Sequence, residues 1–431
     1  MWRRARWLML LTLLIPGSAQ LVAGNRKLAR VALFLTLLAW ASIALFGLIY
    51  LVNRGWFLSI IATPWLDSVA SVIFSFTAFF YALITLDTLR LVKLGRLTGA
   101  ARWVSLSALL VLAIFGSSIA ATGAKVATQE GQLISKVFER GGFTAQADGR
   151  YNILMLGGDA GSDRFGLRPD SISVLSINAN TGQTLNIGIP RNMQRVNFVA
   201  GSPMRQIYPD GWSCGIDCLI NAIYKDVTDN HADAYPNAVN QGSSAGVEAT
   251  REAVEWVTGL KIQSYILVDM SGFERLINAL GGVNINVKYR LPVGGGEDIY
   301  GQPINVRRWI EPGYQHLNGK YALWYARARH GTSDYARMAR QREVINAIVQ
   351  QSDAANLLTR LEKIARAGEK LIKTDIPRPM LGQYVDLALK AKAIGLKPIE
   401  LVPPEFDMIH PDFTAIRAKI NQALVAESVA P

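Results

Sequence analysis

Long apolar runs dominate the first third of the chain and predict helices that cross a membrane. Three are long enough to span the roughly 30 Å hydrocarbon core of a bilayer, and they cover Ala29–Val52, Ser68–Leu86 and Trp103–Ala121. A shorter run, Trp7–Val22, is interrupted by Pro16 and Gly17. We interpret it as a re-entrant or interfacial hairpin, with a full crossing as the alternative. A cleaved signal peptide fits less well because further spans follow.

Beyond residue 122 the pattern changes to the short segments of a globular domain. Strands are predicted at Ile153–Leu156, Ser171–Ile177, Thr184–Ile189, Tyr265–Val268 and Val283–Val287, and helices at Gly246–Thr258, Phe273–Leu280, Lys320–Arg329 and Val344–Val349. Helices that alternate with strands cover the faces of a sheet, so the pattern predicts an α/β domain. After residue 350 we expect mainly helices, with a Pro-rich strand or loop at Lys397–Phe406.

These patterns divide the chain into a transmembrane region (1–122), a linker (123–150) and an outer domain (151–431). In the linker, Lys125–Arg140 is expected to form a short amphipathic helix, which Gly141 and Gly142 end. The outer domain is expected to consist of a core, 151–349, and a helical C-terminal part, 350–431.

The net charge of +12 is concentrated at the edges of the apolar runs. Residues 1–122 hold eleven Lys/Arg against two Asp, whereas the rest holds 34 basic and 31 acidic residues. Basic residues flank membrane spans on the cytoplasmic side, so the basic segment Asp87–Arg102 is assigned to the cytoplasm. The outer domain is then extracytoplasmic, and nucleic acid is not an expected partner.

The chain has two cysteines, Cys214 and Cys218. A metal site of two thiolates needs further Cys or a nearby His, so we favour a short-loop disulfide in an oxidising outer compartment.

Carboxylates and arginines gather where the first three predicted strands begin or end. Asp159 follows the first strand, Arg168 and Asp170 precede the second, and Arg191 follows the third. The arginine fork binds phosphate oxygens, and hard cations such as Mg²⁺ bind carboxylate and phosphate oxygens. The sequence therefore predicts a site for a phosphate and a divalent cation at the edge of a sheet.

A second group of arginines lies near the last predicted helices of the core. Between residues 327 and 342 stand Arg327, Arg329, Arg337, Arg340 and Arg342, with Gln341 among them. Such a cluster repels itself unless a polyanion binds, and a pyrophosphate would suit it; a solvated surface is the alternative. The sequence contains no P-loop, HExxH, GxSxG or CxxC motif, so ATP-driven, zinc-protease and serine-hydrolase functions lack their parts.

Three sequence blocks cover about Tyr151–Val349. In chain order they are GGD…RPDSISV with IPRN, YILVDMSGFERLINALGGV, and HLNGKYALWYARAR…DYARMARQREVI. In this order they resemble the LytR–CpsA–Psr family of cell-wall phosphotransferases. The resemblance implies a three-layer α/β domain with a central mixed sheet flanked by helices, preceded by an all-α transmembrane region.

The resemblance also implies roles for individual residues. Asp159 and Asp170 match the family's metal-binding aspartates, with Mg²⁺ or Mn²⁺ as the cofactor, and the catalytic set is Asp159, Asp170, Arg191 and Arg327. The arginines that match pyrophosphate contacts are Arg168, Arg191, Arg327 and Arg329, with further contacts from Arg337 and Gln341. A polyprenyl slot is expected at Ile266, Phe273, Leu276 and Ile277, for which an ordinary hydrophobic core is the alternative.

The function implied is transfer of a glycopolymer from a polyprenyl-pyrophosphate carrier to a peptidoglycan hydroxyl by an enzyme anchored in the lipid bilayer. The hydrophobic N-terminus and the cysteine pair resemble actinobacterial members, for which the polymer is arabinogalactan or another secondary wall polymer. Two alternatives are a polyprenyl-pyrophosphate hydrolase and a non-enzymatic membrane regulator or lipid sensor.

Overall fold

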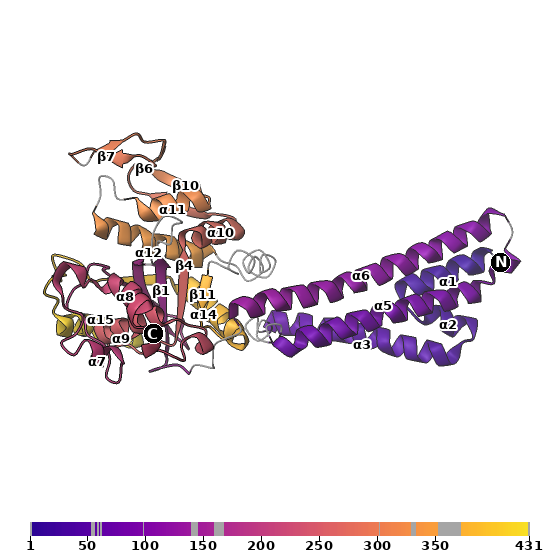
Figure 1. The fold of residues 1–431 in the computed structure, drawn as a ribbon. Coiled ribbons are helices and arrows are strands. Elements are labelled where there is room, and N and C mark those ends of the chain that lie inside the picture. Colours follow the sequence, from indigo (N-terminus) through magenta and orange to yellow (C-terminus); the bar gives the residue numbers. More distant parts are fainter. Residues whose placement is uncertain are drawn as a thin grey trace. The chain divides into compact units, whose positions relative to one another are not determined.

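The structure is a computed structural model, and it describes residues 2–52, 57, 60, 63–97, 99–138, 145–158, 168–300, 302–328, 333–351 and 372–429. The chain divides into two compact units, Met1–Gln132 and Leu133–Pro431, which are described one at a time (Figure 1).

The described residues of the first unit form helices joined by short turns. Its helices are α1 (Trp2–Leu14), α2 (Ser18–Ala23), α3 (Arg26–Val52), α5 (Pro64–Val92) and α6 (Ala100–Phe138), with a 3₁₀ turn at Leu94–Arg96. Within the part of the chain that the structure describes, three helical stretches are long and apolar enough to cross a membrane, namely Arg26–Val52, Leu66–Arg96 and Ala100–Lys125. Most of their large apolar side chains are exposed, as those of Phe34, Leu51 and Ile114 illustrate. The three predicted apolar runs are therefore helices of the length and composition that anchor a protein in a bilayer.

The predicted separation of the third span from a short linker helix is wrong. Helix α6 continues from Ala100 to Phe138, through the position where we expected the span to end. Gly123 costs only about 1 kcal/mol in a helix interior, and no proline follows it in this helix. A long helix tolerates that loss, so the linker begins as a continuation of α6.

The short run before α3 folds as a helical hairpin. Helix α1 has 13 residues, about 20 Å, which is less than the hydrocarbon thickness of a bilayer. At the turn, a Cβ on Gly17 would lie 2.5 Å from the Cβ of Ala32, so only glycine fits there. Gln20 in α2 donates to the hydroxyl of Thr88 in α5 at 3.0 Å, and Thr88 contacts Thr12 in α1 at 2.9 Å. The hairpin therefore packs on α5 through buried polar groups.

The second unit is built on one mixed sheet of six strands. The strand order is β11-β4-β1-β2-β3-β12. Strand β1 pairs antiparallel with β2 and parallel with β4, while β2 pairs antiparallel with β3, β3 parallel with β12, and β4 antiparallel with β11. The strands are β1 (Arg150–Gly158), β2 (Pro169–Asn178), β3 (Thr184–Ile189), β4 (Ser264–Asp269), β11 (Ile372–Thr374) and β12 (Leu396–Glu400).

Helices cover both faces of this sheet. One face carries Leu154, Val174 and Ile187 and packs on apolar residues of helices α8, α9 and α15. The other face carries Ile153 and Leu175 and packs on α14 and part of α12. These helices are α8 (Ile223–Asn230), α9 (Ala245–Thr258), α12 (Asp334–Gln351), α14 (Leu381–Ile394) and α15 (Phe413–Val429), and a short α7 covers Met204–Ile207. The predicted three-layer α/β fold with a central mixed sheet is confirmed.

A smaller module lies beside the sheet and has its own core. It contains α10 (Met270–Leu280), α11 (Gly319–Arg327), β5 (Val283–Val287), β6 (Leu291–Val293), β7 (Gly296–Glu297), β8 (Pro303–Ile304), β9 (Arg308–Ile310) and β10 (Gly313–Leu317). Strand pairs β5–β10, β6–β9 and β7–β8 form two-stranded sheets of their own, and α10 and α11 pack on them together with α12. The predicted strand at Val283–Val287 is therefore present, outside the central sheet.

The description of residues 350–431 as a helical part is wrong in one respect. This part contains α14 and α15, but it also supplies β11 and β12, which form the two edges of the central sheet. Strand β11 has only three residues, too few for a visible alternation. Strand β12 contains Pro398, which a sheet accepts at its edge because no neighbouring strand needs the missing N–H. Strand β12 overlaps Lys397–Phe406, for which the sequence predicted either a strand or a loop.

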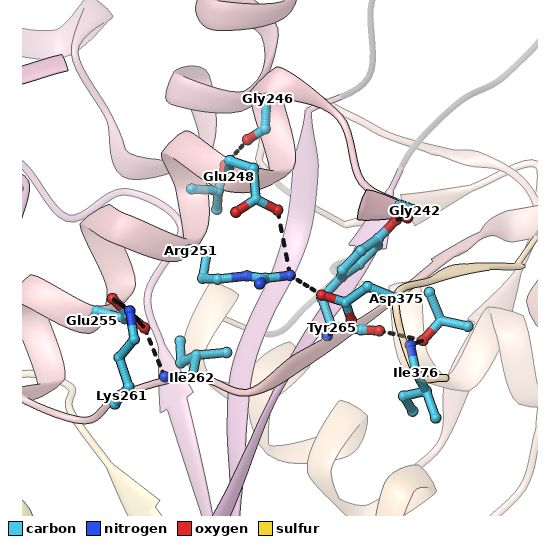
Figure 2. A network of polar contacts seen from close by, with 12 residues as sticks. Gly242, Gly246, Glu248, Arg251, Glu255, Lys261, Ile262, Tyr265, Asp375 and Ile376 are labelled. Carbon is cyan, nitrogen blue, oxygen red and sulfur yellow. Dashed lines mark hydrogen bonds and ion pairs between the residues drawn. The ribbon is translucent and has the colours of Figure 1, made fainter. Parts of the chain in front are cut away.

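A buried ionic network holds β11 to the rest of the unit (Figure 2). Arg251 of α9 forms an ion pair with Asp375, directly after β11, and lies 3.5 Å from Glu248. The other carboxyl oxygen of Asp375 accepts a hydrogen bond from the backbone N–H of Tyr265 in β4 at 2.8 Å. The Arg251 guanidinium also lies 5.6 Å from the Tyr265 ring centre. A helix, a central strand and an edge strand are thus joined by one pair of charges.

Candidate functional site

Four strands begin or end at the same end of the central sheet, and polar side chains follow or precede them there. Gly158 at the end of β1 pairs with Pro169 at the start of β2, and Asp170 follows in β2. Because β3 is antiparallel to β2, its last residue, Ile189, lies at the same end, and Arg191 follows two positions later. The end of the parallel strand β4 also lies there, since it pairs with the last residues of β1. The topology therefore gathers side chains from segments that are far apart in the sequence.

Arg191 bridges two carboxylates at this end of the sheet. Its Nη1 donates to Oδ1 of Asp170, and its Nε donates to Oδ2 of Asp334 at 3.0 Å. The same oxygen of Asp334 accepts a hydrogen bond from Nη2 of Arg337 at 3.2 Å. These four residues, which we call the Arg191 cluster, alternate positive and negative charges. Helix α12 begins at Asp334, so the carboxylate also stands at the positive end of a helix dipole.

The Arg191 cluster is part-buried, so its charges are only partly screened. The side chains of Arg191, Asp170 and Asp334 are 26, 26 and 30 % exposed, and that of Arg337 is 3 % exposed. Burial acts to lower the pKa of Arg191, but Asp170 and Asp334 outweigh it, and the pKa of Arg191 is raised above its usual value. Arg191 therefore keeps its charge, and a ligand that enters the cluster meets fixed cations.

Helices α11 and α12 place further polar groups beside the Arg191 cluster. Asn318 caps α11 by accepting from the N–H of Tyr321, and the helix ends at Arg327, which is exposed. Gln341 lies one turn after Arg337 on α12, and its amide nitrogen lies 3.4 Å from the carbonyl oxygen of Ala326. Arg327, Arg337 and Gln341 thus come from two helices that meet at the same place.

An apolar cavity of about 480 Å³ opens beside these groups. Asp170, Arg327, Arg337 and Gln341 supply most of its polar side chains. Its apolar walls come from β1, α10, α11 and α12, and include Met155, Phe273, Leu276, Trp324, Ile345 and Ile348. We call this cavity the slot. Its size is typical of ligand pockets, and it combines a polar side with a long apolar wall.

The predicted polar site residues and two of the predicted slot residues fall into three groups. The structure brings together Asp170, Arg191, Arg327, Arg337 and Gln341, and it places Phe273 and Leu276 in the wall of the slot. Arg168 is described and exposed, at the start of β2. Asp159 and Arg329 lie outside the described residues.

Two predicted slot residues lie elsewhere among the described side chains. Ile277 is fully buried in the core of the small module. Ile266 packs in the core between the sheet and α14, next to Met155, with which it pairs across the β1–β4 ladder. Neither belongs to the lining of the slot. For these two residues the hydrophobic core is the interpretation that the structure favours.

Cys214 and Cys218 form a disulfide, and the segment after it supports the Arg191 loop. The backbone N–H of Ile220 donates to the carbonyl oxygen of Met193 at 2.9 Å, and that of Asn221 donates to the carbonyl oxygen of Arg191 at 3.3 Å. The disulfide therefore closes a short loop whose exit is hydrogen-bonded to the backbone that carries Arg191.

The site has donors suited to a hard divalent cation. Mg²⁺ binds through one or two carboxylates, several waters and the phosphates of a substrate. Among the residues that the structure describes, no three His, Cys, Asp or Glu side chains converge, so a cage made of protein ligands alone is not seen there. Asp170 offers carboxylate oxygens beside Arg191 and Arg337, an arrangement that suits a cation shared with a phosphate.

Sequence reasoning considers Asp334, beside Asp159 and Asp170, only as a group that could orient or deprotonate the attacking hydroxyl, and it misses both the pairing of Asp334 with Arg191 and the role of Trp324. Asp334 pairs with Arg191, which lies 143 positions earlier, and nothing local in the sequence reveals such a pair. Trp324 lines the slot, and its signal was available in the α11 pattern, where an aromatic residue precedes Arg327 by three positions, on the same helix face.

Comparison with known proteins gives one family match. The model of the LytR_cpsA_psr family matches residues 114–402, which extends beyond the three blocks on both sides and includes β12. Among curated proteins, the chain is 31 % identical over 211 residues to the polyisoprenyl-teichoic acid–peptidoglycan teichoic acid transferase TagV of Bacillus subtilis strain 168, covering 48 % of this chain and 45 % of that protein. It is 25 % identical over 232 residues to the biofilm regulatory protein A of Streptococcus mutans, covering 52 and 50 %.

The chain thus spans about half the length of these curated relatives. Among solved structures, that of B. subtilis TagV is 23 % identical, covers 66 % of this chain and all of that chain, and has a TM-score of 0.46.

Proposed function

Because this chain belongs to the LytR_cpsA_psr family, we propose that it is a membrane-anchored phosphotransferase that moves a glycopolymer from a polyprenyl-pyrophosphate carrier to peptidoglycan. The observation that carries the proposal is the position of the Arg191 cluster next to the slot. The cluster offers cations to a pyrophosphate, and the slot offers an apolar wall to the hydrocarbon chain attached to it. A lipid-linked pyrophosphate combines these two features.

The proposed reaction needs no ATP, because the donor pyrophosphate is already activated. A peptidoglycan hydroxyl attacks the phosphorus that carries the glycan, and its oxygen forms a new P–O bond. The bond from this phosphorus to the bridging oxygen breaks, and polyprenyl phosphate leaves with the electron pair. The hydroxyl proton passes to a base or to solvent. The products are polyprenyl phosphate and a phosphodiester between glycan and peptidoglycan.

The arginines stabilise the charge that develops in this reaction. Arg191, Arg327 and Arg337 lie where they can bind phosphate oxygens, and a fixed cation is most effective when the charge on the leaving group grows. Arg168 and Arg329 are proposed to extend this group, as the sequence predicted. Gln341 offers an amide to the same head group. Asp334 accepts hydrogen bonds from both Arg191 and Arg337, so it is better suited to align them than to act as a base.

A divalent cation is proposed as cofactor, held by Asp170 and Asp159. When bound, Mg²⁺ or Mn²⁺ would neutralise phosphate charge and withdraw electrons from phosphorus. Arg191 binds the Asp170 carboxylate, so it competes with a cation for that group. We expect the cation to enter together with the donor, because the donor phosphate gives Arg191 another anion to bind.

The proposal includes a polymer and a cellular location for the reaction. Curated relatives are named as teichoic acid transferases; for this chain we propose arabinogalactan or another secondary wall polymer, on the actinobacterial resemblance of its N-terminal region. Three apolar helices and the excess of basic residues between the spans support a multi-pass anchor with the α/β unit outside the cytoplasmic membrane.

The direct test uses the full chain in detergent micelles with a labelled polyprenyl-pyrophosphate glycan, peptidoglycan oligomers and Mg²⁺. We expect label in a phosphodiester with peptidoglycan, and loss of that product when the cation is chelated. Release of glycan phosphate without ligation would identify a hydrolase. Donor binding without turnover of either kind would support a non-enzymatic membrane regulator or lipid sensor; the S. mutans relative is named as a regulatory protein.

The slot gives a second prediction, on the length of the lipid. Replacing Leu276 with tryptophan is expected to weaken binding of a donor with a long polyprenyl chain about tenfold or more, because the larger side chain occupies the slot that the lipid would enter. A donor with a very short prenyl chain should bind equally well to both proteins. Calorimetry or a competition assay with the two donors measures the difference.

The neighbouring residue provides a matched control for the Leu276 variant. Ile277→Val alters a fully buried side chain on the same helix, away from the slot, and should cost only about 1 kcal/mol of stability. It should leave the preference for long chains unchanged. Equal loss of long and short donors in Leu276→Trp would mean that the slot does not hold the lipid.

A further inference from the structure

All three side-chain nitrogens of Arg340, on α12, donate hydrogen bonds to other residues of the protein. Its Nε donates to the carbonyl oxygen of Tyr325 at 2.9 Å, its Nη2 donates to the carbonyl oxygen of Ala328, and its Nη1 donates to the hydroxyl of Tyr289 at 2.7 Å. The residue is 2 % exposed. Although it stands beside Gln341 in an arginine-rich segment, it is oriented toward carbonyl oxygens and not toward the slot.

The carbonyl groups that Arg340 binds lie on both sides of Arg327. Helix α11 ends at Arg327, and the last carbonyls of a helix have no partner within it. Arg340 binds those of Tyr325 and Ala328, and Gln341 lies 3.4 Å from that of Ala326. A cation at the carboxyl end of a helix is also favoured by the helix dipole. The peptide groups around Arg327 are therefore fixed from α12.

The third partner of Arg340 ties this arrangement to the small module. Tyr289 follows β5, and its hydroxyl accepts a hydrogen bond from Arg340. The centre of its ring also lies 5.8 Å from the Arg340 guanidinium carbon. Arg340 thus joins three segments, which are the end of α11, helix α12 and the exit of β5. Two of its nitrogens bind carbonyl oxygens at the end of α11 and the third binds Tyr289. A lysine ammonium at that place lacks the planar fork that reaches all three acceptors.

We propose that Arg340 is a positioning residue that sets the direction of Arg327 at the slot. This inference rests on the proposed function, in which Arg327 binds the donor pyrophosphate. Arg327 and Arg337 both line the slot but come from different helices, so their separation depends on how the end of α11 is held against α12. Arg340 controls that separation because it is rooted on α12 and binds the end of α11.

The test is a double-mutant cycle on the full chain in detergent, with Arg340→Met, Arg327→Ala and the combined variant. Two quantities are measured, the rate of glycan transfer and the affinity for inorganic pyrophosphate. Arg340→Met is expected to lower transfer roughly 10- to 100-fold, because a displacement of about 1 Å in a positioning contact has effects of this size. The combined variant should lose no more than Arg327→Ala alone, because Arg340 acts through Arg327.

Arg150 offers a matched control at the opposite end of β1. It is also a buried arginine that donates to two backbone carbonyls, those of Ser176 and Gln183, and it pairs with Glu427. Arg150→Met should lower stability without changing transfer or pyrophosphate affinity. Hydrogen exchange of the peptide 324–328 should accelerate in Arg340→Met and stay unchanged in Arg150→Met. Tyr289→Phe, which removes one of three partners, should have a smaller effect than Arg340→Met.

The outcomes separate this inference from the proposed function. Additive losses in the cycle, or equal effects of Arg340→Met and Arg150→Met, would overturn the positioning role. If the wild-type chain binds pyrophosphate but transfers no glycan, the proposed function fails, and the cycle in pyrophosphate affinity still decides the role of Arg340. If the wild-type chain neither binds pyrophosphate nor transfers glycan, both are overturned.

Discussion

Replacing Arg191 with alanine is expected to lower the rate of glycan transfer by roughly 10²- to 10³-fold, the range found when a preorganised charge-stabilising group is removed. Two effects act in the same direction. The variant loses a cation that would bind the donor phosphate, and it leaves the carboxylates of Asp170 and Asp334 without the guanidinium that separates them. The pyrophosphate would then meet more net negative charge. Steady-state transfer rates of the full chain in micelles measure the effect.

Arg191→Lys distinguishes charge from geometry. Lysine keeps the positive charge but bonds two carboxylates less well, because it lacks the fork, so an intermediate rate is expected. Arg205→Ala, which removes an exposed arginine on α7, is the control and should transfer at the wild-type rate. Retention of most of the rate in Arg191→Ala would remove Arg191 from the site and leave Arg327 and Arg337 to bind the phosphate alone.

The sequence predicts the strands of the sheet better than the partners of its polar groups. The predicted third strand, Thr184–Ile189, has the bounds of β3 in the structure, because a short apolar run stands between a turn and a proline. These are local signals. The pair between Arg191 and Asp334 depends instead on how α12 packs against the end of the sheet, which is a property of the whole fold.

The apolar residues of α10 show a second limit. Phe273, Leu276 and Ile277 all belong to one amphipathic pattern, but the first two line the slot and the third enters the core of the small module. Periodicity identifies the apolar face of a helix, yet it does not say whether that face contacts other side chains or lines a cavity.

The arginines of α12 show the same limit for charge. Arg337, Arg340 and Gln341 lie close together on the helix, and the sequence suggests a common anionic ligand for them. In the structure Arg337 and Gln341 line the slot, whereas Arg340 binds backbone carbonyls of α11. Three or four residues of spacing are one helical turn, so a small rotation decides between a ligand and a neighbouring helix as the partner.

Replacing Arg251 with methionine is expected to destabilise the α/β unit by about 3–5 kcal/mol, because it leaves the buried carboxylate of Asp375 without its cation. Burial raises the pKa of Asp375 above its usual value, and Arg251 opposes that rise. Without Arg251 the pKa should rise further, so the folded variant holds a proton that the unfolded chain releases at about pH 4. The stability of the variant therefore falls as pH rises from about 4 toward the raised pKa of Asp375 in the folded variant. The loss of stability relative to wild type should be larger at pH 7.5 than at pH 4.5.

Hydrogen exchange of β4 and β11 peptides in the full chain, corrected for the pH dependence of intrinsic exchange, measures this stability. Arg251→Met with Asp375→Asn should recover part of the loss, since the double change removes the unpaired charge. Lys225→Met, which breaks an exposed pair with Asp229 on α8, should change stability by less than about 0.5 kcal/mol. A loss in Arg251→Met that is small, or equal at both pH values, would show that the charge pair does not hold β11. In that case the backbone ladder between β11 and β4 must hold this edge of the sheet, next to Val268 in the wall of the slot.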